Sequence, residues 1–261
     1  MRLGFSAVTA GLADPREALE LAAELGLDLE LSVDQQEIFP QLPGPRELRE
    51  MARAAGVGFT VHLPFVDLNL ASVVEPAWRV SLERMQRALE FAAGLEARVG
   101  VLHTGRIPMR HPLLIEAAKE QLVQALERLS PPPLPVGVEN LALDRYDLLE
   151  TPEELVQLVE SAGTGFGYTL DMPHAYMQGG AGQVHAYLEA MQASSAPLLH
   201  LHLHDNHGDR DAHLPVGAGS LPYEQFKEAL SGFTGTAALE VAGGAAGVRS
   251  SLQVLRQAWD I

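Results

Sequence analysis

The chain of 261 residues carries 18 Lys and Arg against 34 Asp and Glu, a formal net charge of −16, and 47% of its residues are hydrophobic. This composition excludes intrinsic disorder, and the negative charge disfavours extended nucleic acid as a partner, because duplex binding depends on many Lys and Arg side chains at the phosphates. The absence of cysteine excludes disulfides, thiolate nucleophiles and thiolate zinc sites.

Short apolar runs alternate with amphipathic stretches along the whole chain, a pattern typical of parallel strands with helices packed outside. The predicted strands are Leu3–Ser6, Leu27–Leu31, Val57–His62, Val99–His103, Val136–Glu139, Gly165–Asp171, Leu198–His204 and Ala237–Val241. Proline beside a capping or acidic residue marks helix starts at Asp14-Pro15, Glu75-Pro76 and Thr151-Pro152. We therefore predict an α/β fold, a single (β/α)8 TIM-barrel domain over residues 1–261 with a parallel eight-stranded barrel and outer helices.

The seventh predicted strand shows which side chains point into this barrel. His200, His202 and His204 alternate with leucines along it. Successive side chains of a strand point to opposite faces, and the leucines must face the apolar helices. The three imidazoles therefore point into the barrel.

Six consecutive strands end in, or just beside, a side chain that can bind a metal ion. These are His62, His103, Glu139, Asp171, His202 and Glu240, and the following loops add His174, Asp211 and His213. In a TIM barrel these strand ends meet at one mouth, where active sites lie. So many carboxylates and imidazoles would repel and desolvate one another unless cations compensated them. The nine side chains predict a divalent metal site, with oxygen and nitrogen ligands that suit Zn, Mn, Co or Mg.

The same residues stand in phrases that resemble the xylose isomerase-like TIM barrel superfamily, which includes sugar phosphate isomerases and epimerases and endonuclease IV-like proteins. The phrases are Val61-His62-Leu63-Pro64-Phe65, Leu102-His103-Thr104-Gly105, Val138-Glu139-Asn140, Leu170-Asp171-Met172-Pro173-His174, His202-Leu203-His204-Asp205, Asp211-Ala212-His213 and Leu239-Glu240. The resemblance implies a central metal site shared by the epimerases, made of Glu139, Asp171, His202 and Glu240. It also implies that the other five candidates fill the remaining ligand positions of a trinuclear zinc cluster. The resemblance therefore implies one to three divalent ions per chain.

Three functions remain open at this point. We favour a metal-dependent isomerase or epimerase of a sugar or sugar phosphate, acting through an enediolate-type intermediate with Glu139 and Glu240 as catalytic residues. The alternative is an endonuclease IV-like multi-zinc phosphoesterase or AP endonuclease, which the complete ligand set favours and the acidic balance opposes. A barrel that binds a metal or small molecule without turnover would leave the mutually repulsive cluster unexplained.

The sequence carries weaker signals for the substrate-binding residues and for the cellular location. We predict Arg106, which can bind a phosphate or carboxylate, and His204 as substrate-binding residues; a solvated loop charge is the alternative for Arg106. The two lysines, Lys119 and Lys227, fall in predicted helices, which disfavours a Schiff-base mechanism. No run reaches the roughly 18 apolar residues of a membrane span, and no signal-peptide pattern opens the chain. We expect a cytoplasmic protein without a membrane partner, and a homo-oligomer stays open.

Overall fold

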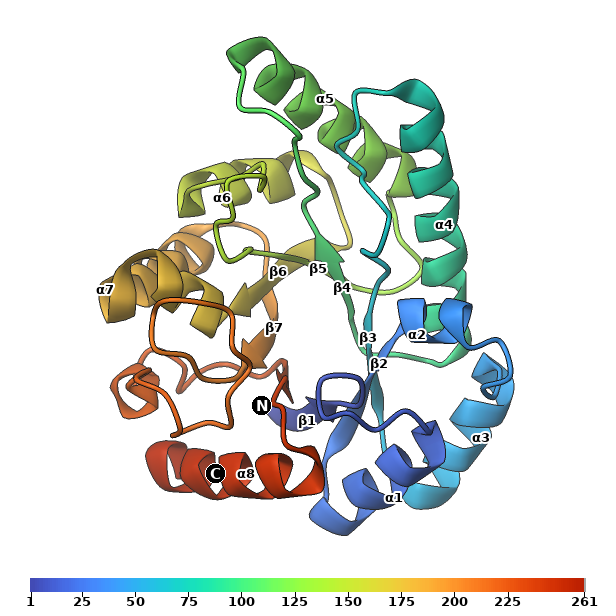
Figure 1. Ribbon diagram of the computed structural model, residues 1–261, viewed down its shortest axis with the longest axis vertical. Helices are drawn as coiled ribbons and strands as arrows, with labels where there is room; N and C mark the ends of the chain where they lie inside the picture. Colours follow the sequence, from blue (N-terminus) through green and yellow to red (C-terminus); the bar gives the residue numbers. More distant parts are fainter. Residues whose placement is uncertain (261) are drawn as a thin grey trace.

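The computed structural model describes residues 1–260, and it contains the predicted closed barrel of eight parallel strands (Figure 1). The strands are β1 (Arg2–Ser6), β2 (Asp28–Ser32), β3 (Phe59–His62), β4 (Gly100–His103), β5 (Val136–Glu139), β6 (Phe166–Asp171), β7 (Leu198–Leu203) and β8 (Thr236–Leu239). The helices are α1 (Pro15–Leu25), α2 (Val33–Ile38), α3 (Pro45–Ala55), α4 (Glu75–Gly94), α5 (Pro112–Leu129), α6 (Pro152–Ser161), α7 (Met172–Ala193) and α8 (Gly244–Trp259), with a short 3-10 turn η1 (Tyr223–Phe226). The strands pair in chain order, and β1 pairs with both β2 and β8, which closes the sheet.

The helices begin where proline and capping residues predict. The side chain of Asp14 accepts a hydrogen bond from the amide of Arg16 at the start of α1, and Thr151 caps α6 in the same way. Two strands end earlier than predicted, so that His204 and Glu240 follow β7 and β8 instead of lying within or at the end of them. The Glu240 amide still donates to the Leu203 carbonyl at 3.0 Å, because the segments that continue β7 and β8 diverge only beyond this hydrogen bond.

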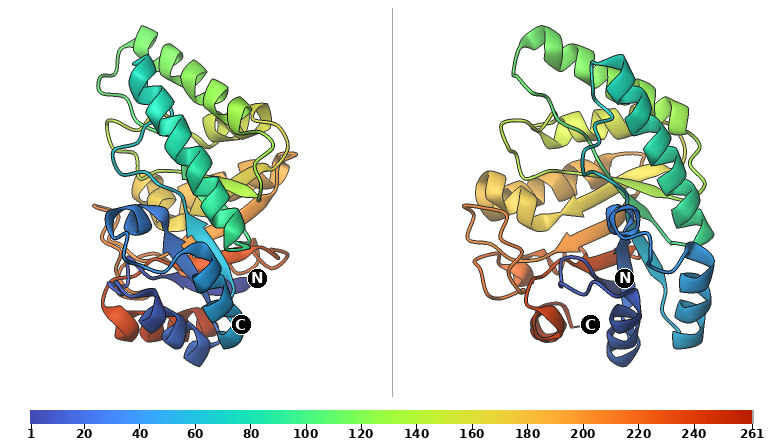
Figure 2. Two further views of the ribbon diagram at one scale, coloured as in Figure 1. Left: turned by 90° about the vertical axis from the view of Figure 1, so that its right-hand side faces the viewer. Right: turned by 45° about the vertical axis from the view of Figure 1, so that its right-hand side comes forward.

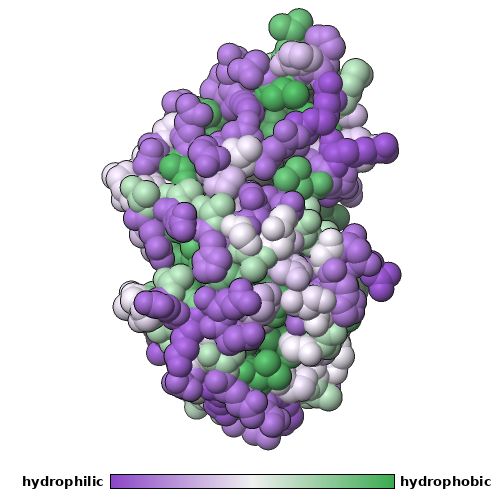
Figure 3. Space-filling view, turned by 90° about the vertical axis from the view of Figure 1, so that its left-hand side faces the viewer, coloured by the Kyte–Doolittle hydropathy of each residue, from purple (hydrophilic) through white to green (hydrophobic). Residues whose placement is uncertain are grey.

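Helices surround the barrel on all sides, and the apolar core fills the layer between the helices and the sheet (Figure 1). Figure 2 shows α4 and α5 running side by side, with the two termini close together near β1 and α8. On the face shown in Figure 3, hydrophilic residues predominate and apolar residues are interspersed among them. Among residues 1–260, no helix combines the length and the apolar character needed to cross a membrane.

A buried carboxylate closes the amino end of the barrel. Asp28 opens β2, and both of its oxygens lie 2.9 Å from the guanidinium of Arg2. Arg98 approaches to 3.2 Å, and the Gly58 amide donates to the same carboxylate at 2.9 Å. Burial raises the pKa of Asp28, but these donors and positive charges outweigh burial and hold the pKa below its ordinary value.

The substitution Asp28→Asn is expected to lower the free energy of unfolding at pH 7 by about 1–3 kcal/mol, because the amide loses the charge and turns a donor toward the half-exposed arginines. A carboxylate whose pKa is lowered by folding stabilises the fold above its unfolded pKa, and this contribution disappears as the pH falls through the folded pKa. The difference between the two proteins should therefore shrink below about pH 4. Urea denaturation at pH 7 and pH 3 measures the difference in the free energy of unfolding. Equal stability of the two proteins at pH 7 would contradict the stabilising role of the Asp28 carboxylate.

Candidate metal centre

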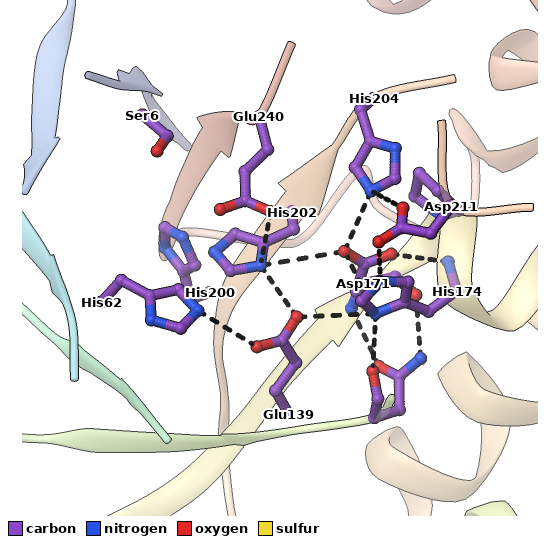
Figure 4. Close-up of polar contacts among 12 residues, drawn as sticks. Ser6, His62, Glu139, Asp171, His174, His200, His202, His204, Asp211 and Glu240 are labelled. Carbon is purple, nitrogen blue, oxygen red and sulfur yellow. Dashed lines mark hydrogen bonds and ion pairs between the residues drawn. The ribbon is translucent and has the colours of Figure 1, made fainter. Parts of the chain in front are cut away.

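All nine predicted ligand residues lie together at the carboxyl end of the barrel. Figure 4 labels seven of them: His62, Glu139, Asp171, His174, His202, Asp211 and Glu240. The last residues of β3 to β6 are His62, His103, Glu139 and Asp171. His202 lies in β7, Glu240 follows β8, His174 lies in the first turn of α7, and Asp211 and His213 lie in the loop after β7. Strand parity and strand endings therefore place the side chains as the sequence predicts. Their role as metal ligands stays a prediction that the geometry below supports.

Glu139 is the carboxylate shared by two groups of side chains. Its Oε2 atom lies 3.0 Å from His103 Nε2 and 3.9 Å from His62 Nε2. Its Oε1 atom lies 3.0 Å from Nδ1 of His202. The side chain is 1% exposed, and Oε1 also lies 3.7 Å from Nδ1 of His174. Glu139 would therefore be available to a cation held by either group.

The central cluster is built around Nδ1 of His202. Three carboxylates converge on this one nitrogen: Glu139 at 3.0 Å, Glu240 at 3.5 Å and Asp171 at 3.8 Å. The three carboxylates come from β5, the end of β8 and β6, so the barrel itself fixes their approach. Asp171 is further held by its Oδ1 atom, which accepts from the amide of His174 at 2.6 Å and caps α7.

A third group lies beside the central cluster. Asp211 Oδ2 lies 3.2 Å from His213 Nε2 and 3.4 Å from His174 Nε2. His204 is fully buried between the two carboxylates, with Nε2 at 3.3 Å from Asp171 and 3.7 Å from Asp211. Its ring stacks on that of His213 at 4.1 Å between centroids. His204 was predicted to bind substrate; the structure places it beneath the cavity wall, among the candidate ligands.

The carboxylates of the central cluster differ in their protonation. Burial raises the pKa of Glu139, but the imidazoles of His202 and His103 outweigh burial and hold that pKa well below its ordinary value. Burial raises the pKa of Glu240 to about 7, and the negative charges of Glu30 and Glu139 add to the effect of burial while His202 opposes it. Two carboxylates with separated pKa values are typical of an acid–base pair.

The imidazoles carry the compensating charge when only protons are bound. Burial lowers the pKa of His174, but the charges of Asp171 and Asp211 prevail and raise it to about 10. Burial also lowers the pKa of His213, but the hydrogen bond to Asp211 and the charge of Glu240 outweigh burial and raise it to about 9. Protons on these rings therefore occupy the positions where a divalent cation would neutralise the same carboxylates.

The residues present fit a divalent cation by donor chemistry. Four triads at this end of the barrel each offer nitrogen and oxygen atoms within 4.8 Å of one another. They are His62 with His103 and Glu139, Glu139 with Asp171 and His202, Asp171 with His174 and His204, and His204 with Asp211 and His213. Glu139 Oε2 and His204 Nδ1 are buried atoms without a hydrogen-bond partner among the described residues. Mixed imidazole and carboxylate donors suit Zn, Mn or Co.

The loop that carries Asp211 and His213 is fastened at both ends by Asp205. This buried carboxylate accepts from the amides of Asn206 at 2.9 Å, Gly217 at 2.9 Å and Leu221 at 3.1 Å. A Cβ atom on Gly219 would lie 2.3 Å from Asp205 Oδ1, so only glycine permits the close approach of this loop. Asp205 thus positions two candidate ligands that it does not itself touch.

The substitution Asp205→Ala is expected to release this loop, because three amides lose their acceptor, and each of the two buried ones, of Asn206 and Leu221, costs about 1–3 kcal/mol when unsatisfied. Amide hydrogen exchange between residues 207 and 220 should accelerate at least about tenfold, since 1.4 kcal/mol corresponds to a factor of ten. Asp209→Ala, an exposed aspartate of the same loop, is the matched control and should leave exchange unchanged. Equal protection in both variants would contradict the fastening role.

A cavity of about 340 Å³ lies over the cluster, and Glu139, Glu240, Asp211 and His213 form part of its lining. Its remaining lining includes Ser6, Thr9, Ser32, Phe65, Leu68, Leu141, Ala142 and Asp144. The volume is within the range of roughly 300–1,000 Å³ typical of small-molecule sites. A ligand of sugar size can therefore reach both catalytic candidates.

Arg106 lines the cavity as predicted, but its guanidinium is engaged by acidic side chains. Nε lies 3.3 Å from the buried Asp147, and Nη2 lies 3.6 Å from Asp144. Arg110, the other arginine of this loop, pairs with Glu150 and donates to the Asp147 carbonyl at 3.0 Å. These contacts reduce the positive charge that either arginine offers to an anionic group.

One buried acid of the barrel interior was not singled out from the sequence. Glu30, in the middle of β2, is 1% exposed and contacts His200 and His202 across the barrel. Its signal is the alternation of Asp28 and Glu30 with leucines, the same parity that places the histidines of β7 inside.

Known proteins resemble this chain in both sequence and structure. The family described as xylose isomerase-like TIM barrel matches residues 16–258. The uncharacterised protein MJ1311 of Methanocaldococcus jannaschii is 30% identical over 200 residues, which cover 74% of this chain and 67% of the relative. A solved D-tagatose 3-epimerase-like protein superposes with a TM-score of 0.85 at 26% identity, covering 100% of this chain and 97% of the other. The TTHB071 protein of Thermus thermophilus, soaked with ZnCl2, gives 0.73 at 26% identity over 98% and 96% of the two chains.

Proposed function

Because the chain belongs to the xylose isomerase-like TIM barrel family, we propose that it is a divalent-metal-dependent isomerase or epimerase acting on a sugar or sugar phosphate. The similarity to a D-tagatose 3-epimerase-like protein supports the substrate class. A zinc-soaked crystal of another similar protein agrees with a metal cofactor. We propose Zn, Mn, Co or Mg as the metal, with one to three ions per chain.

One observation carries the proposal: two carboxylates from well-separated strands converge on the same ring nitrogen below the cavity. Glu139 ends β5 and Glu240 follows β8, and both lie within 3.5 Å of His202 Nδ1. Both also line the cavity. A substrate bound there has a carboxylate on each side, the arrangement needed to remove a proton from one face of a carbon atom and return it to the other.

Glu139, Asp171, His202 and Glu240 would hold the central cation. When bound there, the cation supplies Lewis acidity that polarises a substrate carbonyl and acidifies the neighbouring C–H bond. Glu139 then accepts the proton from that carbon at a carboxylate oxygen, and Glu240 donates a proton to the opposite face, or the two exchange roles in the reverse direction. Phe65, whose ring stacks on His103 at 4.8 Å, gives the cavity an apolar wall that excludes water from one side.

Phosphoester hydrolysis is the second candidate, and the two flanking triads favour it. His62 and His103 lie beside Glu139 on one side, and Asp211 and His213 lie on the other, so donors for two further ions are in place. Several cations clamp a phosphate and generate a hydroxide nucleophile in such sites. The engagement of Arg106 by acids and the net charge of −16 oppose an extended anionic substrate.

Proton exchange with solvent tests the proposed function directly. Protein loaded with Mn, Co or Zn is expected to epimerise or isomerise at least one of a panel of ketoses in D2O, with deuterium incorporated at the carbon next to the carbonyl. Nuclear magnetic resonance follows the exchange and chromatography follows the conversion. Parallel assays use a nitrophenyl phosphodiester and an oligonucleotide with an abasic site. Hydrolysis of either without exchange at any sugar would favour the second candidate.

A further inference from the structure

Glu30 lies below the central cluster, inside the barrel, and is fully enclosed by protein. It comes from β2, whereas His200 and His202 come from β7, and these two strands are not neighbours in the closed sheet. The contact therefore crosses the barrel interior. Glu30 Oε2 lies 3.1 Å from His200 Nε2, and Oε1 lies 3.3 Å from His202 Nε2. Both contacts have ion-pair distances but lie off the straight hydrogen-bond direction.

Two threonines fix the members of this group. Thr60, the register partner of Glu30 on β3, donates its hydroxyl to Glu30 Oε2 at 3.0 Å. Thr236, at the start of β8, lies 2.6 Å from Nδ1 of His200. When the Thr236 hydroxyl donates to Nδ1, the proton of His200 lies on Nε2, where it faces Glu30. The Glu30 carboxylate thus accepts from one hydroxyl and faces two imidazoles, from the two strands β3 and β7.

The two ring nitrogens of His202 face different partners. Nδ1 points to the three carboxylates of the central cluster, whereas Nε2 points to Glu30. A cation held by the three carboxylates would exclude a proton from Nδ1, and Glu30 beside Nε2 then favours the tautomer that carries its proton on Nε2 and leaves Nδ1 free as a ligand. A histidine ligand held in this way is more basic and better oriented than a free one.

We propose that Glu30 is a positioning residue that keeps a proton on His202 Nε2 and thereby presents His202 Nδ1 as the ligand atom of the central site. This inference rests on the metal dependence of the proposed function. It deepens that proposal by assigning the ligand nitrogen and by giving a role to a carboxylate that touches neither the cavity nor the substrate. Glu30 also adds a negative charge beneath the site, which favours a cation above it.

Metal affinity, measured without any substrate, tests the role of Glu30. Metal-free protein is titrated with Co2+ in competition with a chelating dye, in a His103→Ala, His213→Ala background that removes a donor from each flanking triad. Glu30→Gln is expected to weaken Co2+ binding by about 10–100-fold, the usual effect of losing the hydrogen-bond partner of a metal-bound histidine. Asp28→Asn removes the other buried acid of the same strand and should leave the Co2+ affinity unchanged. Equal affinity in all three proteins would overturn the role of Glu30.

A second measurement needs no substitution at Glu30. In zinc-loaded wild-type protein labelled with 15N-histidine, His202 should show a protonated Nε2 and a metal-bound Nδ1 in long-range proton–nitrogen spectra. A metal-bound Nε2 with a protonated Nδ1 would overturn the inference even if Glu30→Gln does not fold. Failure of the wild type to bind Co2+ or Zn2+ would overturn both this inference and the metal dependence. Weakened binding in Glu30→Gln with no turnover of any sugar would leave the inference standing and contradict the proposed substrate class.

Discussion

Replacing Glu240 by glutamine is expected to lower kcat for sugar epimerisation by about 10²–10⁴-fold, the contribution typical of a positioned general acid or base. Glutamine keeps the size of the side chain and can still offer one oxygen to a cation. It cannot exchange a proton with a carbon atom in the cavity. Steady-state kinetics with the metal-loaded variant, normalised to its measured metal content, give the effect on the proton-transfer step alone.

Deuterium exchange sharpens this result. With Glu240→Gln, exchange is expected to persist for the epimer whose proton faces Glu139, while conversion to the other epimer stops. Glu189→Gln, at an exposed position of α7, is the matched control and should retain full activity. If conversion by Glu240→Gln fell by less than about tenfold, Glu240 would act as a ligand only and not as an acid or base.

The barrel and the ring of polar strand ends were predictable because both follow from local rules. Apolar runs of strand length alternate with helices, and each run stops at a polar residue that must lie where the strands leave the core. Parity then places His200 and His202 of β7 inside together with His204, which directly follows the strand, and the structure shows all three fully buried. The ends of β7 and β8 were less well predicted. Strand pairing stops after Leu203 and Leu239 because the two strands diverge there, and the sequence alone does not show where neighbouring strands diverge.

Glu30 was not predicted because it lies in the middle of β2, whereas the predicted site residues lie at or near strand ends or in loops. A glutamate at that position suggests an exposed strand face when the sequence is considered alone, since buried acids are rare. Only the contact with β7 across the barrel shows that two imidazoles stabilise it. The alternation of Glu30 with leucines shows which face of β2 it lies on, but no local rule tells whether an acid on that face is buried in the barrel or exposed to solvent.

Contacts between segments that are distant in the sequence set the surroundings of Arg106 and His204, whose role in substrate binding stays a prediction. Arg106 is engaged by Asp147 and Asp144 from the loop after β5, about forty residues further along the chain. His204 is covered because the segment after β7 folds back, and the Tyr223 hydroxyl donates to the His204 carbonyl at 2.5 Å. Such long-range packing is not encoded in any short motif around either residue.

Removing divalent cations is expected to lower the Tm substantially. Five carboxylates gather at the mouth of the barrel and just beneath it, namely the buried Glu30, Glu139, Asp171 and Glu240 and the partly exposed Asp211, and protons on imidazoles compensate them only in part. A cation at about 1,000 times its Kd stabilises the folded state by about 4 kcal/mol. For a domain of this size the corresponding rise in Tm is about 8–16 °C. Thermal unfolding with and without a chelator, followed by restoration with Zn2+ or Mn2+, measures it.

Asp171→Asn should abolish most of this gain while leaving the metal-free fold nearly intact. The asparagine Oδ1 can still accept from the His174 amide and cap α7, but the carboxylate charge facing His202 is lost. Asp28→Asn makes the same chemical change at the opposite end of the barrel and should lower the Tm of both forms while preserving the gain from metal. Full metal content in Asp171→Asn, measured by elemental analysis, would mean that the central cluster does not hold the cation. A Tm that does not respond to the chelator would mean that imidazole protons alone balance these buried carboxylates.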